Sequence, residues 1–424
     1  MAFGSNVAPA ANGKAAVTDP VRVMVVDDSV VVRGLIGRWI DEDPALAVVA
    51  SHRNGKLAVD DIARSEPDVV VLDVEMPEMD GMTALPLLLK QKPNLVIVMA
   101  STLTRRNAEI SMKCLALGAA DYVPKPESNS RVTTSDEFRH EVVEKVRVLG
   151  QRAKARAARA AGHAAPAVSP PQDFRALRSL PPQHAPIAKV VRTPFATPPA
   201  AGRVWTTSPA PVVGGRMGPA GISLRPYANV PPRILVIGSS TGGPQALTKL
   251  FGDIGPAIGN LPVLVTQHMP AAFTAILAEH ISKAAGRRAA EGVHGEPLMP
   301  GRIYVAPGGK HMVIARDAGD IVVQLNDLPP VNFCKPAVDP LFQSVVPLYG
   351  SAILGAVLTG MGHDGAAGSK LIADAGGSVI AQDEESSVVW GMPGAVAQAG
   401  AAAEILPLDQ IGPKIIRILG GGRP

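Results

Sequence analysis

The chain has 424 residues, 46% of them apolar and 18% charged, which describes a globular protein too long for one ordinary core. Its net charge of +4 misrepresents the folded parts, because residues 151–230 hold 11 of the 41 Lys and Arg residues and a single acid, Asp173. The remaining 30 basic and 36 acidic residues argue against nucleic-acid binding by a globular domain, although a contact between the basic segment and a polyanion or membrane surface stays open.

The start of the chain, residues 1–20, lacks the basic stretch and apolar core of a signal peptide, so we expect a disordered leader. No apolar run is long enough to span a bilayer. The two cysteines, Cys114 and Cys334, lie in different halves without metal-ligand spacing, which indicates free thiols in a reducing compartment. These features predict a soluble, cytoplasmic protein with no membrane insertion.

Residues 21–150 form the first predicted domain. Short β-branched runs alternate there with amphipathic stretches of about a dozen residues, which predicts βαβ units and a parallel sheet with helices on both faces. A flavodoxin-like arrangement is the leading candidate. The predicted strands are 21–26, 47–50, 69–72, 96–100 and 120–123, and the predicted last helix is 137–149.

Residues 151–230 form a predicted linker. Its Ala/Arg-rich beginning favours a helix, and the Pro-rich run that follows favours partly polyproline II structure without a core of its own. Alternation resumes in residues 231–424, which predicts a second α/β domain with a doubly wound parallel sheet. The predicted strands of this domain are 234–237, 263–266, 303–305, 353–358 and 378–381.

Acidic residues follow two predicted strands of the first domain. Asp27 and Asp28 follow the first strand and Asp73 the third, so a parallel sheet gathers all three carboxylates at its carboxyl edge. Mg²⁺ suits such a cluster, because it binds a few carboxylate and carbonyl oxygens and keeps waters. Ser101 and Lys125 follow the fourth and fifth strands, from which each can contact a phosphoryl oxygen.

Three runs in this domain resemble the response-regulator receiver domain: VVDDS at 25–29, LDVEMPEMDG at 72–81 and YVPKP at 122–126. The resemblance implies a flavodoxin-like fold in which Asp73 is the phosphoacceptor. Asp28 and Asp73, with the carbonyl of Glu75, would hold Mg²⁺ for phosphorylation. The remaining implied contacts to the phosphate, or switch residues, are Asp27, Ser101, Tyr122 and Lys125.

The second domain opens with a strand that runs into Gly-Ser-Ser-Thr-Gly-Gly-Pro at 238–244, where Gly-x-Ser-x-Gly centres on Ser240. Such a turn can lift a serine hydroxyl clear of the sheet edge, while the following helix N-terminus presents N–H groups to developing negative charge. A phosphate-cradling loop is the main alternative, but both the G-x-G-x-x-G order and the P-loop lysine are missing.

A serine nucleophile needs a base and a group that orients the base. His268 and Asp364 follow the strands 263–266 and 353–358, so three strand ends of a parallel sheet could bring them to Ser240. The order Ser, His, Asp differs from that of α/β-hydrolases. His280 lies in a predicted helical stretch and His294 among turn residues, so neither is a leading candidate for the base. His311 and His363 stay open as competing bases.

Several separated runs of this domain resemble the chemotaxis methylesterase catalytic domain (CheB): GSSTGG at 238–243, TQHMP at 266–270, APGGKHM at 306–312, LTGMGHDG at 358–365 and GMP at 391–393. The resemblance implies protein-glutamate methylesterase and protein-glutamine deamidase activity. Ser240, His268 and Asp364 would form the triad, with Met361 and Thr241 as oxyanion or supporting residues. Hydrolysis would need no cofactor, chemoreceptors would be the substrates, and a chemotaxis histidine kinase would be the phosphodonor.

Two features depart from the family pattern. Ser239 stands where the family more often has alanine, and the linker is longer and richer in proline than expected.

A binding function, rather than an enzymatic one, also stays open for the second domain. In that alternative the domain is a non-catalytic output whose glycine-rich loop holds a small anion. A DNA-binding output is disfavoured, because no C-terminal helix-turn-helix pattern with a basic helix is present.

Overall fold

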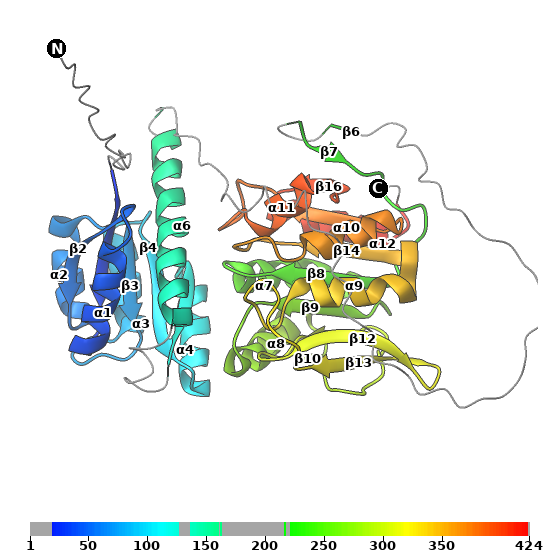
Figure 1. The fold of residues 1–424 in the computed structure, drawn as a ribbon, viewed down its shortest axis with the longest axis horizontal. Helices are drawn as coiled ribbons and strands as arrows, with labels where there is room; N and C mark the ends of the chain where they lie inside the picture. Colours follow the sequence, from blue (N-terminus) through cyan, green and yellow to red (C-terminus); the bar gives the residue numbers. More distant parts are fainter. Residues whose placement is uncertain (1–18, 127–135, 161, 163–215, 218–220, 423–424) are drawn as a thin grey trace, which may run out of the picture. The chain divides into compact units, whose positions relative to one another are not determined.

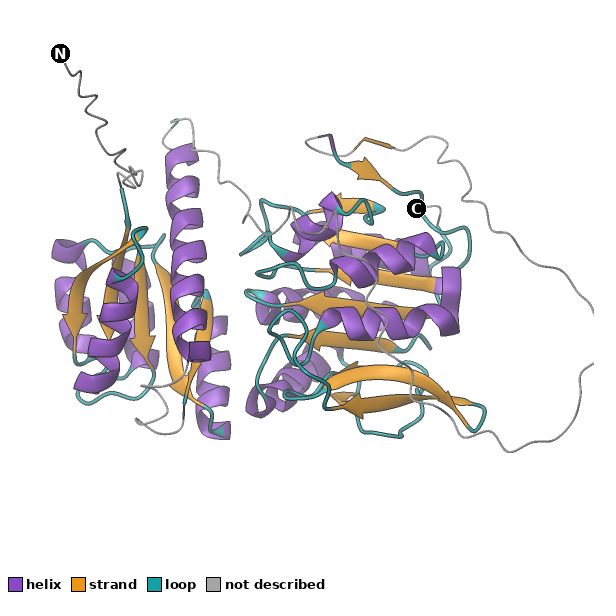
Figure 2. Cartoon of the chain, in the orientation of Figure 1, coloured by secondary structure: helices purple, strands orange, loops and turns teal. Residues whose placement is uncertain are grey.

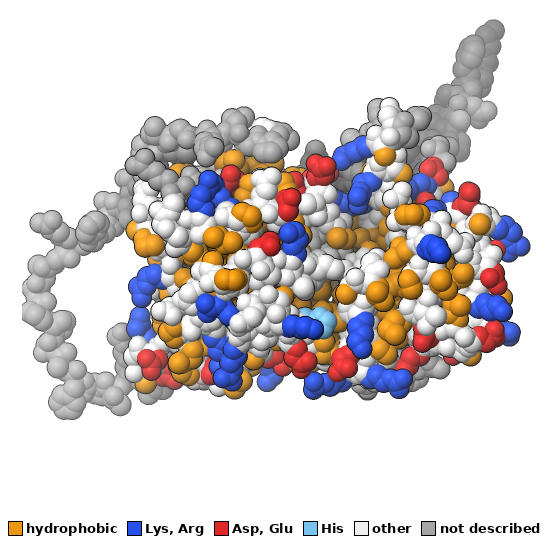
Figure 3. Space-filling model, turned by 180° about the vertical axis from the view of Figure 1, so that it is seen from behind, with side chains coloured by type: hydrophobic (Ala, Val, Ile, Leu, Met, Phe, Trp, Pro, Cys, Tyr) orange, Lys and Arg blue, Asp and Glu red, His pale blue; other side chains and the backbone are white. Residues whose placement is uncertain are grey.

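The computed structural model describes residues 19–126, 136–160, 162, 216–217 and 221–422, which build two α/β domains (Figures 1 and 2). The predicted leader lies almost wholly outside the described residues, as does the Pro-rich part of the predicted linker. No helix in the described part of the chain is both long and apolar enough to cross a membrane. On the face drawn in Figure 3, basic and acidic side chains are interspersed rather than gathered into a field of one sign.

The N-terminal domain has a parallel five-stranded sheet in the order β2-β1-β3-β4-β5, which confirms the flavodoxin-like prediction. Every residue of the central strand β3 is buried, as expected for a sheet covered on both faces. The strands are β1 (Val21–Val26), β2 (Leu46–His52), β3 (Val69–Asp73), β4 (Val96–Thr102) and β5 (Asp121–Lys125).

Four of its helices begin directly after a polar residue that caps them: α1 (Val30–Asp41), α2 (Gly55–Ser65), α3 (Gly81–Gln91) and α4 (Arg105–Ala116). The caps are Ser29, Asn54, Asp80 and Thr104, and each side chain accepts a hydrogen bond from an N–H of the first turn. The caps fix where each chain segment turns from the carboxyl edge of the sheet into a helix.

The last helix of this domain, α6 (Asp136–Ala160), is longer than the predicted 137–149. Its buried residues, Phe138, Val142, Val146 and Leu149, follow helical spacing and end where the prediction ended. The extra turns consist mainly of Ala, Arg and Lys, which have high helix propensity and continue the helix without a core. A side chain at Gly150 would come within 2.3 Å of Val21, so the helix can lie against the sheet only with glycine there.

The C-terminal domain has a seven-stranded parallel sheet in the order β10-β11-β9-β8-β14-β15-β16. All five predicted strands are present, and the edge strands β10 and β16 were missed. The strands are β8 (Ile234–Ser239), β9 (Val263–Gln267), β10 (Ala289–Glu291), β11 (Ile303–Val305), β14 (Ile353–Val357), β15 (Ser378–Gln382) and β16 (Glu404–Leu406).

Two groups of helices pack around this sheet (Figure 1). One group is α7 (Gly243–Ile254), α8 (Ala271–Ala285) and α12 (Leu408–Leu419). The other is α9 (Val338–Tyr349), α10 (Ala366–Asp374) and α11 (Met392–Gln398). An antiparallel hairpin, β12 (His311–Asp317) with β13 (Asp320–Asn326), packs on α9, and a short pair, β6 (Arg216–Met217) with β7 (Ser223–Leu224), precedes the sheet.

The order of the strands marks where the site must lie. The chain leaves β8 for β9 on one side and later returns to β14 on the other side of β8. Ligands of open α/β sheets bind at the carboxyl end of the strands where the order reverses in this way. In this domain that point is the end of β8.

Candidate active site

The acidic cluster of the N-terminal domain forms as predicted. One carboxylate oxygen from each of Asp27, Asp28 and Asp73 lies within 4.8 Å of the other two. The ammonium of Lys125 lies 2.7 Å from Asp27 Oδ2 and 2.7 Å from Asp73 Oδ1. Burial raises the pKa of Asp73 to about 6, with Asp27 and Asp28 adding to the rise and Lys125 opposing it. Negative charge is therefore in excess around a single ammonium.

This donor set fits a hard divalent cation, because three carboxylates of which one is exposed can offer oxygens while leaving room for waters. The side chain of Glu75 is exposed and accepts a hydrogen bond from Asn107, while the role predicted for this residue belongs to its backbone carbonyl.

The two predicted switch residues lie on neighbouring strands. Ser101, in β4, is buried, and its hydroxyl lies 2.9 Å from that of Ser111 in α4. Tyr122 lies in β5, opposite Met99 of β4, and its carbonyl accepts a hydrogen bond from Lys145. Among the described residues no hydrogen bond joins either side chain to Asp73, and the Ser101 hydroxyl is engaged with Ser111.

In the C-terminal domain, Ser240 lies in a tight turn between β8 and α7. Its N–H donates to the carbonyl of Thr359 at 3.0 Å, and its own carbonyl accepts from the N–H of Gly243 at 2.7 Å. Gly242 has a φ of 76°, which glycine adopts without strain. The turn leaves the Ser240 side chain half-buried, at the end of β8 where the strand order reverses.

His268 and Asp364 follow the two strands that flank β8, and they are in contact. His268 Nε2 lies 2.7 Å from Asp364 Oδ2. Burial would raise the pKa of Asp364, but the hydrogen bond and the charge of His268 hold it below the usual value. Burial would lower the pKa of His268, whereas Cys334 and Asp364 raise it to about 10. The carboxylate of Asp364 is therefore stabilised by its contact with the His268 ring.

The other ring nitrogen of His268 faces Cys334, with Nδ1 and Sγ 3.2 Å apart. Within residues 221–422 no hydrogen bond joins the Ser240 hydroxyl to this ring. Because Nε2 is engaged with Asp364, a proton from Ser240 would have to reach Nδ1, the position that Cys334 holds. Cys334 gave no sign in the sequence beyond being an unpaired thiol.

Gln267, which sequence reasoning missed, connects the Ser240 turn to His268. This buried amide accepts a hydrogen bond from the Ser239 hydroxyl at 2.7 Å and donates to the carbonyls of Ser240 at 2.9 Å and His268 at 3.1 Å. A side chain at Gly243 would come within 1.9 Å of its Oε1. Ser239 is thus a fully buried partner of Gln267, and Ser240 is the half-buried serine of the turn.

Asp339, also missed, forms a reciprocal pair of helix caps with Asp364. Asp364 accepts hydrogen bonds from the N–H groups of Val338 (2.5 Å) and Asp339 (3.1 Å) in the first turn of α9. Asp339 Oδ1 in turn accepts from the N–H of Gly368 in α10 at 2.7 Å. Neither helix has a side-chain cap from its own N-cap residue. Burial and the neighbouring charge of Asp364 raise the pKa of Asp339 to about 7.

The predicted supporting residues lie beside Ser240. Met361 is half-buried in the loop after β14, where Gly360 donates to Val389, and within the described residues the Met361 N–H has no hydrogen-bond acceptor. The Thr241 carbonyl accepts from the hydroxyl of Thr359, while its own buried hydroxyl is without a partner among the described residues. Met361 therefore offers a free donor near the turn.

The competing histidines have other surroundings. His311 is buried, with Nδ1 accepting from the N–H of Ala337 and Nε2 lying 3.1 Å from the carbonyl of Pro329, so both nitrogens bind backbone. His363 precedes Asp364, but no hydrogen bond of its ring occurs in the described part of the chain. The geometry therefore favours His268 over both as the base.

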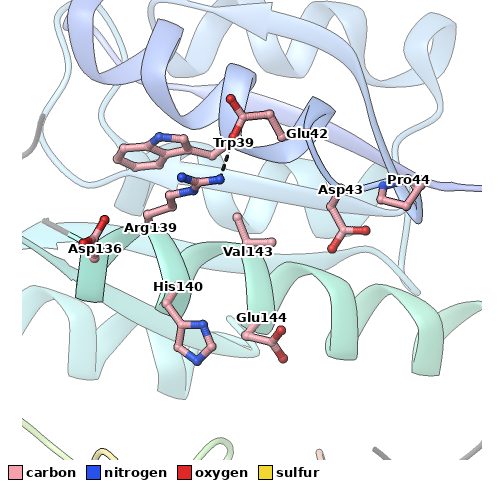
Figure 4. A pocket seen from close by; sticks show the side chains of 9 residues that line it. All are labelled: Trp39, Glu42, Asp43, Pro44, Asp136, Arg139, His140, Val143 and Glu144. Atoms are coloured by element: carbon pink, nitrogen blue, oxygen red, sulfur yellow. Dashed lines mark hydrogen bonds and ion pairs between the residues drawn. The ribbon is translucent and has the colours of Figure 1, made fainter. Parts of the chain in front are cut away.

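A surface pocket of about 450 Å³ lies elsewhere, between the end of α1 and the start of α6 (Figure 4). Trp39 and His140 line it, and Arg139 pairs there with Glu42 at 2.7 Å. Because α1 begins at the acidic edge of the sheet and runs back along it, this pocket lies at the opposite edge from Asp73. It holds neither a nucleophile nor a base that faces one.

Comparison with known proteins identifies both domains. The family model for the CheB methylesterase matches residues 235–415, and that for the response regulator receiver domain matches residues 23–135. A protein-glutamate methylesterase/protein-glutamine glutaminase of Bradyrhizobium diazoefficiens is 52% identical over 423 residues, covering 100% of this chain and 99% of the relative. The chain belongs to the CheB methylesterase family.

Other CheB relatives agree. The protein-glutamate methylesterase/protein-glutamine glutaminase of Azospirillum brasilense is 48% identical over 97% of each chain. The solved CheB methylesterase catalytic domain of Thermotoga maritima is 37% identical, covering 45% of this chain and 100% of its own, with a TM-score of 0.43. The response regulator domain of the same CheB is 37% identical, covering 30% and 94%, with a TM-score of 0.27. The two family models and the full-length relatives confirm both resemblances predicted from sequence, and the roles of individual residues stay predictions.

Proposed function

We propose that the chain demethylates glutamyl methyl esters and deamidates glutamines on chemoreceptors, and that Ser240, His268 and Asp364 carry out both reactions. The names of its relatives supply protein-borne glutamyl methyl esters and glutamines as the substrate class. The observation that carries the assignment of residues is the 2.7 Å contact between His268 and Asp364 at the two strand ends beside the Ser240 turn.

In the proposed mechanism the Ser240 hydroxyl attacks the γ-carbonyl of the ester, and His268 Nδ1 takes its proton after Cys334 yields that position. The proton passes to the departing methanol, or to ammonia when the substrate is a glutamine. Water then hydrolyses the acyl-enzyme through the same base. The Met361 N–H and the N–H groups at the start of α7 would each stabilise the oxyanion by on the order of 3 kcal/mol.

The receiver supplies control. A chemotaxis histidine kinase would phosphorylate Asp73, with Mg²⁺ held by Asp28, Asp73 and the Glu75 carbonyl neutralising charge on the phosphoryl group. Lys125 would pair with the phosphate, and Ser101 would leave Ser111 to reach it. The unphosphorylated receiver would cover the triad, and this rearrangement would release it. This control would act in the cytoplasm, where kinase and receptor signalling domains meet.

Methanol release from methylated receptor, measured with and without a small-molecule phosphodonor, tests the proposal. Ser240→Ala should abolish release while preserving the circular dichroism spectrum. Ser239→Ala should keep much of the turnover, because the Ser239 hydroxyl donates to Gln267 and is not the proposed nucleophile. Wild-type methanol release by Ser240→Ala would reject the assigned nucleophile. A serine-directed fluorophosphonate probe that labels only chains with Ser240 and His268 intact would exclude a purely binding output.

A further inference from the structure

A strained turn in the C-terminal domain carries a highly exposed aromatic side chain. Val331 and Cys334 form an isolated antiparallel bridge, with both N–H groups donating to the opposite carbonyl, at 3.1 and 2.9 Å. The two residues between them, Asn332 and Phe333, have φ values of 51° and 62°. Two-residue turns of this kind need positive φ at both central positions, and Asn-Gly is the favoured pair. Phe333 therefore stands where glycine would be unstrained.

The solvent exposure of Phe333 is also unfavourable. The side chain of Phe333 is 96% exposed, the largest exposure among the large apolar residues of the described chain. An exposed aromatic ring gains nothing from folding, and a bulky residue with positive φ is rare. Backbone strain of this kind occurs mainly at sites that bind or react.

The turn is attached to the catalytic pair on both sides of Phe333. Cys334 Sγ lies 3.2 Å from His268 Nδ1, and Asn332 Nδ2 donates to Asp364 Oδ1 at 3.4 Å. The position of the ring beside the site is thus set by the same residues that hold the base. A small ester would occupy only the space next to Ser240 and His268, whereas a polypeptide substrate continues beyond its reacting side chain.

We propose that Phe333 is a substrate-contact residue, which packs against the receptor polypeptide that flanks the target glutamyl group and so favours protein-borne esters over small ones. The inference rests on the proposed function, from which the substrate class comes. Aromatic residues contribute disproportionately to protein interfaces, because they bury a large rigid surface on contact.

Phe333→Gly tests the inference, because glycine is the residue that this turn prefers and the variant should fold at least as well as the wild type. Full-length chains with phosphodonor present are assayed on methylated receptor and on p-nitrophenyl acetate. We expect KM for the receptor to rise on the order of ten-fold, with hydrolysis of the small ester unchanged. Phe333→Tyr should restore the KM. Val293→Ala, at another apolar residue that is 59% exposed, is the matched control and should behave as wild type.

Equal receptor KM values for Phe333→Gly and wild type would overturn the inference, as would an equal loss on both substrates, which would mean that the turn serves only to hold His268. Absence of methanol release by the wild type would refute the proposed function and this inference with it. Unchanged KM in an active enzyme would refute this inference alone.

Discussion

Asp364→Asn separates the two tasks of this side chain, because it keeps the volume and removes the charge. Asp364 accepts from four donors: His268 Nε2, the N–H groups of Val338 and Asp339, and the amide of Asn332. An asparagine has one acceptor oxygen and one donor group, so whichever way it turns, its NH₂ faces a donor. In either orientation the variant loses one hydrogen bond to the first turn of α9, and the orientation with the NH₂ at the Oδ2 position also changes the contact to the imidazole.

Both losses have expected sizes. Hydrogen bonds to a charged acceptor contribute about 1.5–3 kcal/mol each, so we expect the C-terminal domain to lose about 3 kcal/mol of stability. If the NH₂ faces the ring, Nε2 becomes the acceptor and Nδ1 carries the proton, which leaves Ser240 without a base. In Ser/His/Asp hydrolases this change lowers kcat on the order of 10⁴-fold.

Urea unfolding and methanol release from methylated receptor measure the two effects on the full chain. Asp374→Asn is the matched control, since Asp374 lies at the other end of α10 and, among the described residues, forms ion pairs with Arg225 and Lys370 alone, at 2.8 and 2.9 Å. It should cost at most about 1 kcal/mol and leave turnover unchanged. A folded Asp364→Asn enzyme with turnover within ten-fold of wild type would refute the assigned role.

Three further predictions concern other residues. Cys334→Ala should lower the pKa of His268 from about 10 and move the rising limb of the pH–rate profile to lower pH; an unmoved limb would show that the thiol does not act on the ring. The pKa of the Asp73 carboxyl is raised to about 6 in the folded chain. Its ionisation therefore lowers the free energy of unfolding of the receiver as pH rises from about 4 to 6. Asp73→Asn should therefore stabilise the Mg²⁺-free receiver at pH 8 by up to about 3 kcal/mol, but not at pH 4, and should abolish phosphodonor-dependent activation. Gly243→Ala should displace Gln267 and lower both stability and turnover, because the added methyl group would lie 1.9 Å from Gln267 Oε1. Wild-type stability and turnover in this variant would contradict that reasoning.

The sequence predicted most of the fold, because buried parallel strands are local apolar runs and both sheets consist mainly of them. Each predicted strand exists to within a few residues. The missed strands β10 and β16 have three residues each and are too short for a recognisable pattern. The hairpin β12–β13 was also not among the predicted strands.

Candidate site residues could be selected from the sequence where they lie at or soon after a strand end: Ser240 and His268 directly follow β8 and β9, and Asp364 lies in the loop after β14. Gln267 and Asp339 could not be found in this way. Gln267 is the last residue of β9 and Asp339 lies in the first turn of α9, and their importance comes from hydrogen bonds to distant segments. Such contacts depend on how strands and helices pack, which no local pattern encodes.

The reciprocal caps of α9 and α10 make Asp364, the proposed orienting carboxylate, part of the scaffold. A residue that only oriented His268 could detach while the domain remained folded, giving a structured but inactive population. Asp364 cannot detach without leaving the start of α9 uncapped, and Asp339 links that helix to α10. Heat inactivation of the hydrolase should therefore coincide with melting of these two helices.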